Sequence, residues 1–101
     1  MPYIKKEDRP RIDELIDELG KRITKRGEYN YAITRLIHSY LLRHPRGKCY
    51  DTLCDMTGVL NDVKTEFERT VVGPYEDKKI RENGAVDVLK EGNTDINGTT
   101  N

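Results

Sequence analysis

Tyrosines spaced four or fewer residues from a cation are the residues of this sequence best suited to bind a ligand. Six of the seven aromatic residues are tyrosine. A tyrosine ring can stack on a base while a guanidinium or ammonium group binds phosphate, although a tyrosine can also cover a neighbouring helix and keep its hydroxyl in water. Pairs of this kind nominate five residues for an anionic, nucleotide-like ligand: Tyr31, Arg35, Arg43, Tyr75 and Lys79.

Carboxylates suggest a different chemistry. Glu14 and Asp17 are three residues apart, and Asp62 and Glu66 are four apart, so each pair would share one face of a helix. Carboxylates on facing helices hold Mg²⁺ in helical nucleotide hydrolases, because hard cations select oxygen ligands. Only Glu14 and Asp17 fit the E-x-x-D spacing of those enzymes. A metal-dependent nucleotide (pyro)phosphohydrolase is therefore the enzyme alternative.

The cysteines and histidines do not form a recognisable metal motif. Cys49 and Cys54 are separated by four residues and follow His38 and His44, an order and spacing that match no common zinc site. We therefore assign no metal ligand, no cofactor and no catalytic residue, and expect Cys54 to be a small apolar residue of a helix.

Apolar residues recur at helical spacing in four segments. The stripe from Ile12 to Ile23 predicts a helix over 10–25 that Gly27 ends, and Asn30 can cap a second helix that runs to 44. The short connection predicts that these two helices lie antiparallel. A longer third helix is expected over 51–71, with Asp51 as its cap, and a short helix over 75–82 after an interruption at Gly73-Pro74.

The composition limits the size of the apolar core and indicates the cellular compartment of the protein. The chain has 101 residues, of which 35% are hydrophobic, and 18 Lys+Arg against 18 Asp+Glu. Residues 1–50 carry a net charge of +5 and residues 51–101 a net charge of −5. We expect one helical domain over 1–88, a disordered polar tail over 89–101, a cytoplasmic location (the host cytoplasm if the gene is a phage gene), and a homo-oligomer that completes a thin core.

Several polar positions also resemble a small uncharacterised family found in bacteria, archaea and their phages. The resemblance covers residues 1 to about 88 and rests on MPYIKKEDRP at 1–10, on NYAITRLIHxY at 30–40, on GVL at 58–60 with EFxR at 66–69, and on PYEDxKIxENG at 74–84, where x marks a position outside the motif. It implies a prokaryotic or phage context and transfers no catalytic residue.

The leading interpretation is an all-α, homo-oligomeric, non-enzymatic protein that sequesters an anionic, nucleotide-like small molecule. It is similar in size, polarity and tyrosine usage to the phage proteins that sequester the signalling nucleotides of host immunity, which would make it an anti-defence sponge. Its expected partners are itself and that ligand, without a membrane or duplex nucleic acid. The other alternative is an adaptor or inhibitor that binds a host protein through the acidic second half.

Overall fold

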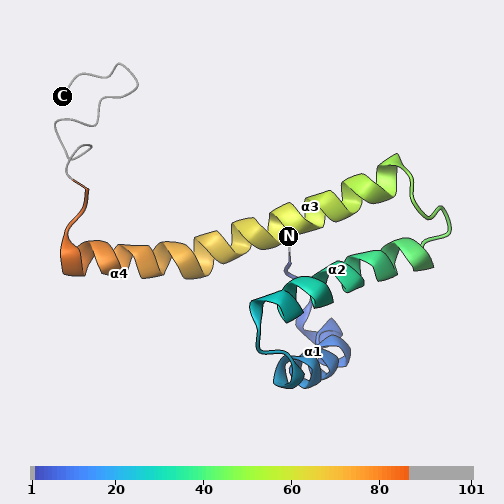
Figure 1. The fold of residues 1–101 in the computed structure, drawn as a ribbon, viewed down its shortest axis with the longest axis horizontal. Helices are drawn as coiled ribbons and strands as arrows, with labels where there is room; N and C mark the ends of the chain where they lie inside the picture. The colour runs from blue at the N-terminus through green and yellow to red at the C-terminus, as the bar shows by residue number, and fades with distance from the viewer. Residues whose placement is uncertain (1, 87–101) are drawn as a thin grey trace, which may run out of the picture. The chain divides into compact units, whose positions relative to one another are not determined.

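Every regular element between residues 2 and 86, the part of the chain that the computed structural model describes, is helical (Figure 1). In chain order these are a 3-10 turn (Lys6–Asp8), α1 (Pro10–Arg22), α2 (Arg26–Arg43), α3 (Tyr50–Phe67), a π-helical turn (Glu68–Val72) and α4 (Gly73–Asn83). The predicted all-helical class is confirmed. The third helix has the same length as the second, 18 residues, and the predicted tail at 89–101 lies outside the described residues.

The chain divides into two compact units, Met1–Lys64 and Thr65–Asn101, which are described separately. The first unit contains α1, α2 and most of α3. The second contains the end of α3, the π-helical turn and α4. The single domain over 1–88 stays a prediction.

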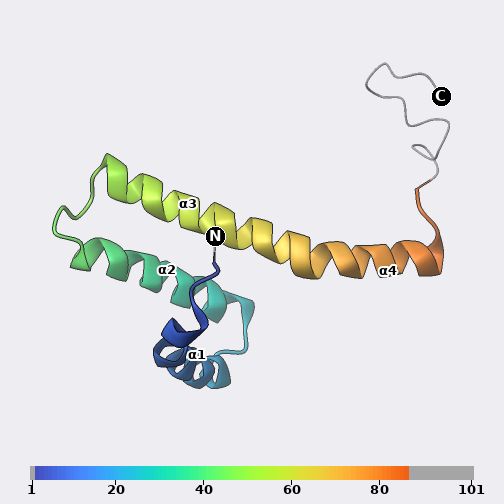
Figure 2. The same ribbon diagram turned by 180° about the vertical axis from the view of Figure 1, so that it is seen from behind.

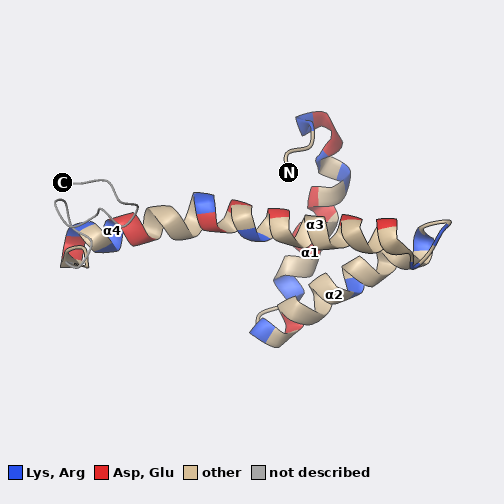
Figure 3. Ribbon diagram, turned by 90° about the horizontal axis from the view of Figure 1, so that it is seen from above, with Lys and Arg blue, Asp and Glu red and all other residues tan. Residues whose placement is uncertain are grey.

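Within the first unit, α2 and α3 run in opposite directions and diverge away from the loop that joins them, and α1 crosses α2 steeply (Figures 1, 2 and 3). The antiparallel pair is therefore α2 with α3, where the sequence predicted the first helix with the second. The Tyr40 hydroxyl of α2 donates a hydrogen bond to Asp55 Oδ2 of α3 at 3.0 Å. This bond to the carboxylate, followed by burial, raises the pKa of Tyr40.

The boundary between α1 and α2 is set by a glutamate rather than by the predicted glycine and asparagine. Glu28 Oε1 accepts hydrogen bonds from the backbone N–H groups of Thr24 (2.9 Å) and Lys25 (3.1 Å), two donors that α2 itself cannot satisfy. These two bonds lower the pKa of Glu28. Gly27 and Asn30 lie inside α2, so their predicted roles as helix end and cap are wrong.

The predicted interruption at Gly73-Pro74 takes the form of a π-helical turn. The Gly73 N–H bonds to the carbonyl of Glu68, five residues earlier, and Pro74 occupies the first turn of α4. A proline lacks the N–H that an α-helix interior needs, and the wider turn accommodates this loss without ending the helical backbone. A Cβ at Gly73 would lie 3.2 Å from the Glu68 oxygen, so the close approach favours glycine.

Thr52 organises the turn between α2 and α3. It is the single fully buried side chain of the described range, at 1% exposure. Its hydroxyl accepts a bond from the Cys49 N–H (3.0 Å) and donates to the carbonyl of Gly47 (2.7 Å). Gly47 has φ +58°, a conformation that other residues adopt only with strain. The helix therefore begins at Tyr50, with Cys49 before it, and the predicted cap Asp51 is its second residue.

No apolar side chain is buried between residues 2 and 86. Leu15 of α1 is 72% exposed, and Leu36 and Leu42 of α2 are 71% and 86% exposed. The helical stripes predicted from the sequence exist, but the first unit covers them only in part. Their apolar area is available to a second molecule.

Replacing Thr52 with valine tests the role of the turn. The change should lower the free energy of unfolding by about 1–3 kcal/mol, because it leaves the Cys49 N–H and the Gly47 carbonyl without their partner. Chemical denaturation at a fixed chain concentration measures the loss. Thr57→Val, at an exposed position of the same helix, is the control, and an equal effect of both variants would show that the hydroxyl network contributes nothing.

Candidate functional site

Three of the five predicted ligand-binding residues lie along one stripe of α2. Tyr31, Arg35, Ser39 and Arg43 follow one another at intervals of four residues, which places them in a row on the helix surface. Arg35 Nη1 donates to the Tyr31 hydroxyl at 3.2 Å, and Arg43 Nε donates to Ser39 Oγ at 3.2 Å. We call these four residues the arginine stripe.

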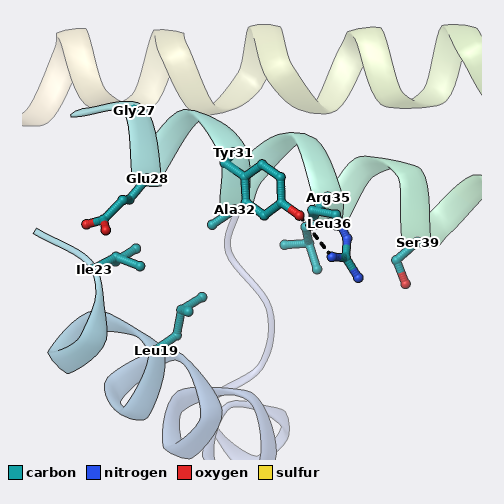
Figure 4. Close-up of a pocket in the computed structure, with 9 residues that line it drawn as sticks. All are labelled: Leu19, Ile23, Gly27, Glu28, Tyr31, Ala32, Arg35, Leu36 and Ser39. Carbon is teal, nitrogen blue, oxygen red and sulfur yellow. Dashed lines mark hydrogen bonds between the residues drawn. The ribbon is translucent and has the colours of Figure 1, made fainter. Parts of the chain in front are cut away.

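Tyr31 and Arg35 face a cavity of about 670 Å³ between α1 and α2 (Figure 4). The Arg35 guanidinium carbon also lies 5.9 Å from the centroid of the Tyr31 ring, within range of a cation–π contact. Leu19 and Ile23 form the opposite wall, and Ala32 and Leu36 the floor on α2. The cavity thus combines apolar walls with one cation and one phenol.

The charge balance of this cavity favours an anion at Arg35. The acidic lining residue is Glu28, and its Oε1 atom is occupied by the two backbone N–H groups at the start of α2. No carboxylate of residues 2–86 forms an ion pair with Arg35. Arg35 therefore keeps N–H donors that a phosphate can accept.

Arg43 lines a neighbouring cavity of about 540 Å³ between α2 and α3. Leu36 and Ser39 belong to both cavities, so the two adjoin along the arginine stripe. Met56 and Val59 contribute the wall from α3. Arg43, too, has no ion pair with a carboxylate in the described part of the chain.

Tyr75 and Lys79 form their own pair in the second unit, on α4. The Lys79 ammonium lies 5.6 Å from the Tyr75 ring centroid and 3.4 Å from Glu82 Oε2. Lys79 is thus already neutralised by a carboxylate, unlike the two arginines of the stripe. The five predicted residues belong to two groups: three on α2 and two on α4.

Acidic residues recur along α3 (Figure 3), but they form no cluster for a cation in the described residues. Within residues 2–86, no three His, Cys, Asp or Glu side chains come together as a possible metal site. Glu66 is in an ion pair with Arg69 at 3.0 Å. Glu14 and Asp17 lie on exposed positions of α1. The carboxylates named for a hydrolase are not assembled into a metal-binding group in this part of the chain.

Cys49 lies at the start of α3 with its thiol beside the Thr52 hydroxyl, at 3.5 Å. The Thr52 hydroxyl, whose single proton can turn from the Gly47 carbonyl to the thiolate, and the Thr52 backbone N–H lower the pKa of the Cys49 thiol, and the nearby positive charge of Arg46 adds to this effect. Arg46 itself bonds Asp51 at 2.8 Å. Cys49 is half-buried, and Cys54 is exposed, so the expectation that Cys54 packs as an apolar residue finds no support in the described contacts.

A family model for a domain of unknown function, DUF6899, matches residues 1–86. The chain belongs to this family. The DUF6899 match covers both groups of predicted ligand-binding residues. It agrees with the resemblance to an uncharacterised family. No curated protein and no solved structure matches the chain.

None of the described helices of this DUF6899 chain has the length and hydropathy that crossing a membrane requires.

Sequence reasoning missed two contributors to these sites. Ser39 completes the arginine stripe. The sequence indicates this position, because residues 31, 35, 39 and 43 follow one another at intervals of four. Thr52 gave no such signal. Its role depends on the fold of the loop that brings the Gly47 carbonyl to its hydroxyl, which the composition of the loop does not reveal.

The lowered pKa of Cys49 predicts that its thiol is alkylated at a lower pH than an ordinary cysteine thiol. In a Cys54→Ser background, the rate of reaction with iodoacetamide should rise at a lower pH for the folded chain than for the same chain unfolded in urea, because more thiolate is present at each pH. Thr52→Val should move that rise to higher pH, and Thr52→Ser, which retains the hydroxyl, should not. Identical profiles for folded and unfolded chains would contradict the assignment.

Proposed function

We propose that this protein is a non-enzymatic, self-associating protein that binds an anionic, nucleotide-like small molecule along the arginine stripe. The observation that supports the proposal is the row formed by Tyr31, Arg35, Ser39 and Arg43, with two guanidinium groups that have no carboxylate partner in the described residues. The ligand is held and released unchanged, as in the sponges with which phages remove signalling nucleotides.

The stripe offers two points of attachment for phosphate. Arg35 and Arg43 are eight residues apart, which corresponds to about 12 Å along the helix axis. Each guanidinium donates one hydrogen bond to a neutral hydroxyl of its own helix and retains donors in a fork that fits phosphate oxygens. A ligand with two phosphate groups, or one that spans both cavities, would use both arginines.

The cavity next to Arg35 suits the remainder of a nucleotide. Its volume of about 670 Å³ falls in the range of small-molecule sites, which combine apolar walls with a few polar groups. The Tyr31 ring supplies a stacking surface, and Leu19 and Leu36 supply apolar contacts. Tyr75 and Lys79 present the same chemistry on α4, with Lys79 already paired to Glu82.

Self-association is the second part of the proposal. Its support is the exposure of the apolar stripes on α1, α2 and α3. Chains of this size often complete their cores by oligomerisation when they leave such area open. A homo-oligomer is therefore the proposed functional form.

Isothermal titration calorimetry against cyclic dinucleotides, cyclic trinucleotides and ADP-ribose isomers tests the ligand. We expect stoichiometric binding of at least one compound, recovered intact afterwards. Arg35→Ala and Arg43→Ala should each weaken it at least tenfold, because a hydrogen bond to a charged group contributes about 1.5–3 kcal/mol. Lys21→Ala, which removes an exposed cation from α1, is the matched control.

The titration, a phosphate-release assay with Mg²⁺ and a pull-down from host lysate together separate the alternatives. No binding across the panel would contradict the proposal, and equal loss in Arg35→Ala and Lys21→Ala would remove the stripe from it. Release of phosphate with Mg²⁺, abolished by Glu66→Gln, would instead identify a nucleotide hydrolase. Retention of a host protein in place of a nucleotide would identify an adaptor.

A further inference from the structure

A second cavity, of about 670 Å³, lies at the end of α2 against the loop that joins α2 to α3. Half of its lining residues are basic, and none of the described residues that line it is acidic. The basic residues are His38, His44, Arg46 and Lys48. The apolar part of the lining consists of Leu41, Leu42 and Pro45. We call this cavity the loop pocket.

The backbone that carries these basic residues is fixed by hydrogen bonds. The buried Thr52 donates to the carbonyl of Gly47, which lines the loop pocket between Arg46 and Lys48. The Arg46 guanidinium is held in turn by Asp51 Oδ2 at 2.8 Å. A loop positioned in this way before a ligand arrives loses less conformational entropy on binding. The one fully buried side chain of residues 2–86 therefore holds the loop of this pocket in place.

Three side chains of the loop pocket keep hydrogen-bond donors for an anion. The Arg46 N–H donates to Nδ1 of His44 at 3.1 Å, so the neutral ring carries its proton on Nε2 and can donate from there. The Lys48 side chain forms no ion pair and no hydrogen bond with residues 2–86. Arg46 donates Nη1 to Asp51 and retains the other N–H groups of its guanidinium.

The combination of donors and apolar surface favours an organic phosphate. Several donors in one cavity suit an anion with several acceptor oxygens, and a phosphate monoester has three such oxygens and a charge of about −1.5 to −2 at pH 7. The apolar part of the lining suits an organic group attached to the phosphate. Leu42 is 86% exposed, so its side chain can cover such a group without leaving a contact inside the fold.

We propose that the loop pocket is a second binding site, which takes a small organic phosphate. The phosphate group binds Lys48, Arg46 and His44, and the organic group lies on the apolar part of the lining. None of the four residues of the arginine stripe lines this pocket. His44 and Pro45 also line the cavity that contains Arg43, so the two sites adjoin at the end of α2. The inference goes beyond the proposed function and does not depend on it.

Titration of the full chain with phenyl phosphate, followed by the NMR signals of the backbone amides, tests the site. The amide signals of Gly47 and Lys48 should shift and reach saturation. Lys48→Gln should weaken this binding about fivefold, because it removes a cation that no described residue neutralises. Lys21→Gln, which removes an exposed cation of α1 outside the pocket, is the matched control and should leave the affinity unchanged.

Two further probes test the chemical class of the ligand. Inorganic phosphate should shift the same amide signals with a lower affinity than phenyl phosphate, and Leu42→Ser should reduce that difference because the ring loses an apolar contact. Benzoate carries the same ring on a carboxylate with a single negative charge. It should bind more weakly than phenyl phosphate, because it offers fewer acceptor oxygens and less charge to the donors of the pocket.

Equal affinities of Lys48→Gln and Lys21→Gln for phenyl phosphate would overturn the inference, as would shifts that do not saturate or that are confined to the arginine stripe. Benzoate that binds as tightly as phenyl phosphate would reject the phosphate class. Arg35→Ala distinguishes the two sites. It should leave the binding of phenyl phosphate at Gly47 and Lys48 intact, whereas it should weaken the ligand of the arginine stripe, so either site can fail without the other.

Discussion

The structure of residues 2–86 depends on apolar side chains that this part of the chain does not bury. Helices form because their residues repeat at helical spacing, yet a helix in water gains most of its stability from covering its apolar face. Leu15, Leu36 and Leu60 remain substantially exposed, and Thr52 alone is fully buried among residues 2–86. The proposed homo-oligomer would supply the burial that these helices lack within the described residues.

Local polar contacts determine where the helices begin and how the first unit is connected. Glu28 binds the N–H groups before α2, and Thr52 fixes the turn before α3. The Tyr40–Asp55 bond joins the two helices. Such contacts select a geometry but contribute little net stability in water. The contacts that define the helix boundaries are therefore local, and the geometry of α2 alone sets the spacing of the arginine stripe.

The helical class and the apolar stripes could be predicted from the sequence because both follow from spacing along one helix. The same reason explains why Tyr31, Arg35 and Arg43 were found together, and why Tyr75 was found with Lys79. Helix boundaries were less predictable. Gly27 and Asn30 are common end and cap residues, but the carboxylate of Glu28 satisfies the same backbone donors from inside α2. Thr52 could not be predicted, since its partners come from the path of the loop.

Thermal unfolding at several chain concentrations tests the dependence on a second copy most directly, with far-ultraviolet circular dichroism as the signal. If association supplies the missing burial, the melting temperature rises steadily over a roughly hundredfold increase in concentration, and helicity falls on dilution. A cooperative transition whose midpoint does not change with concentration would show that the single chain holds its fold alone, and would contradict the account.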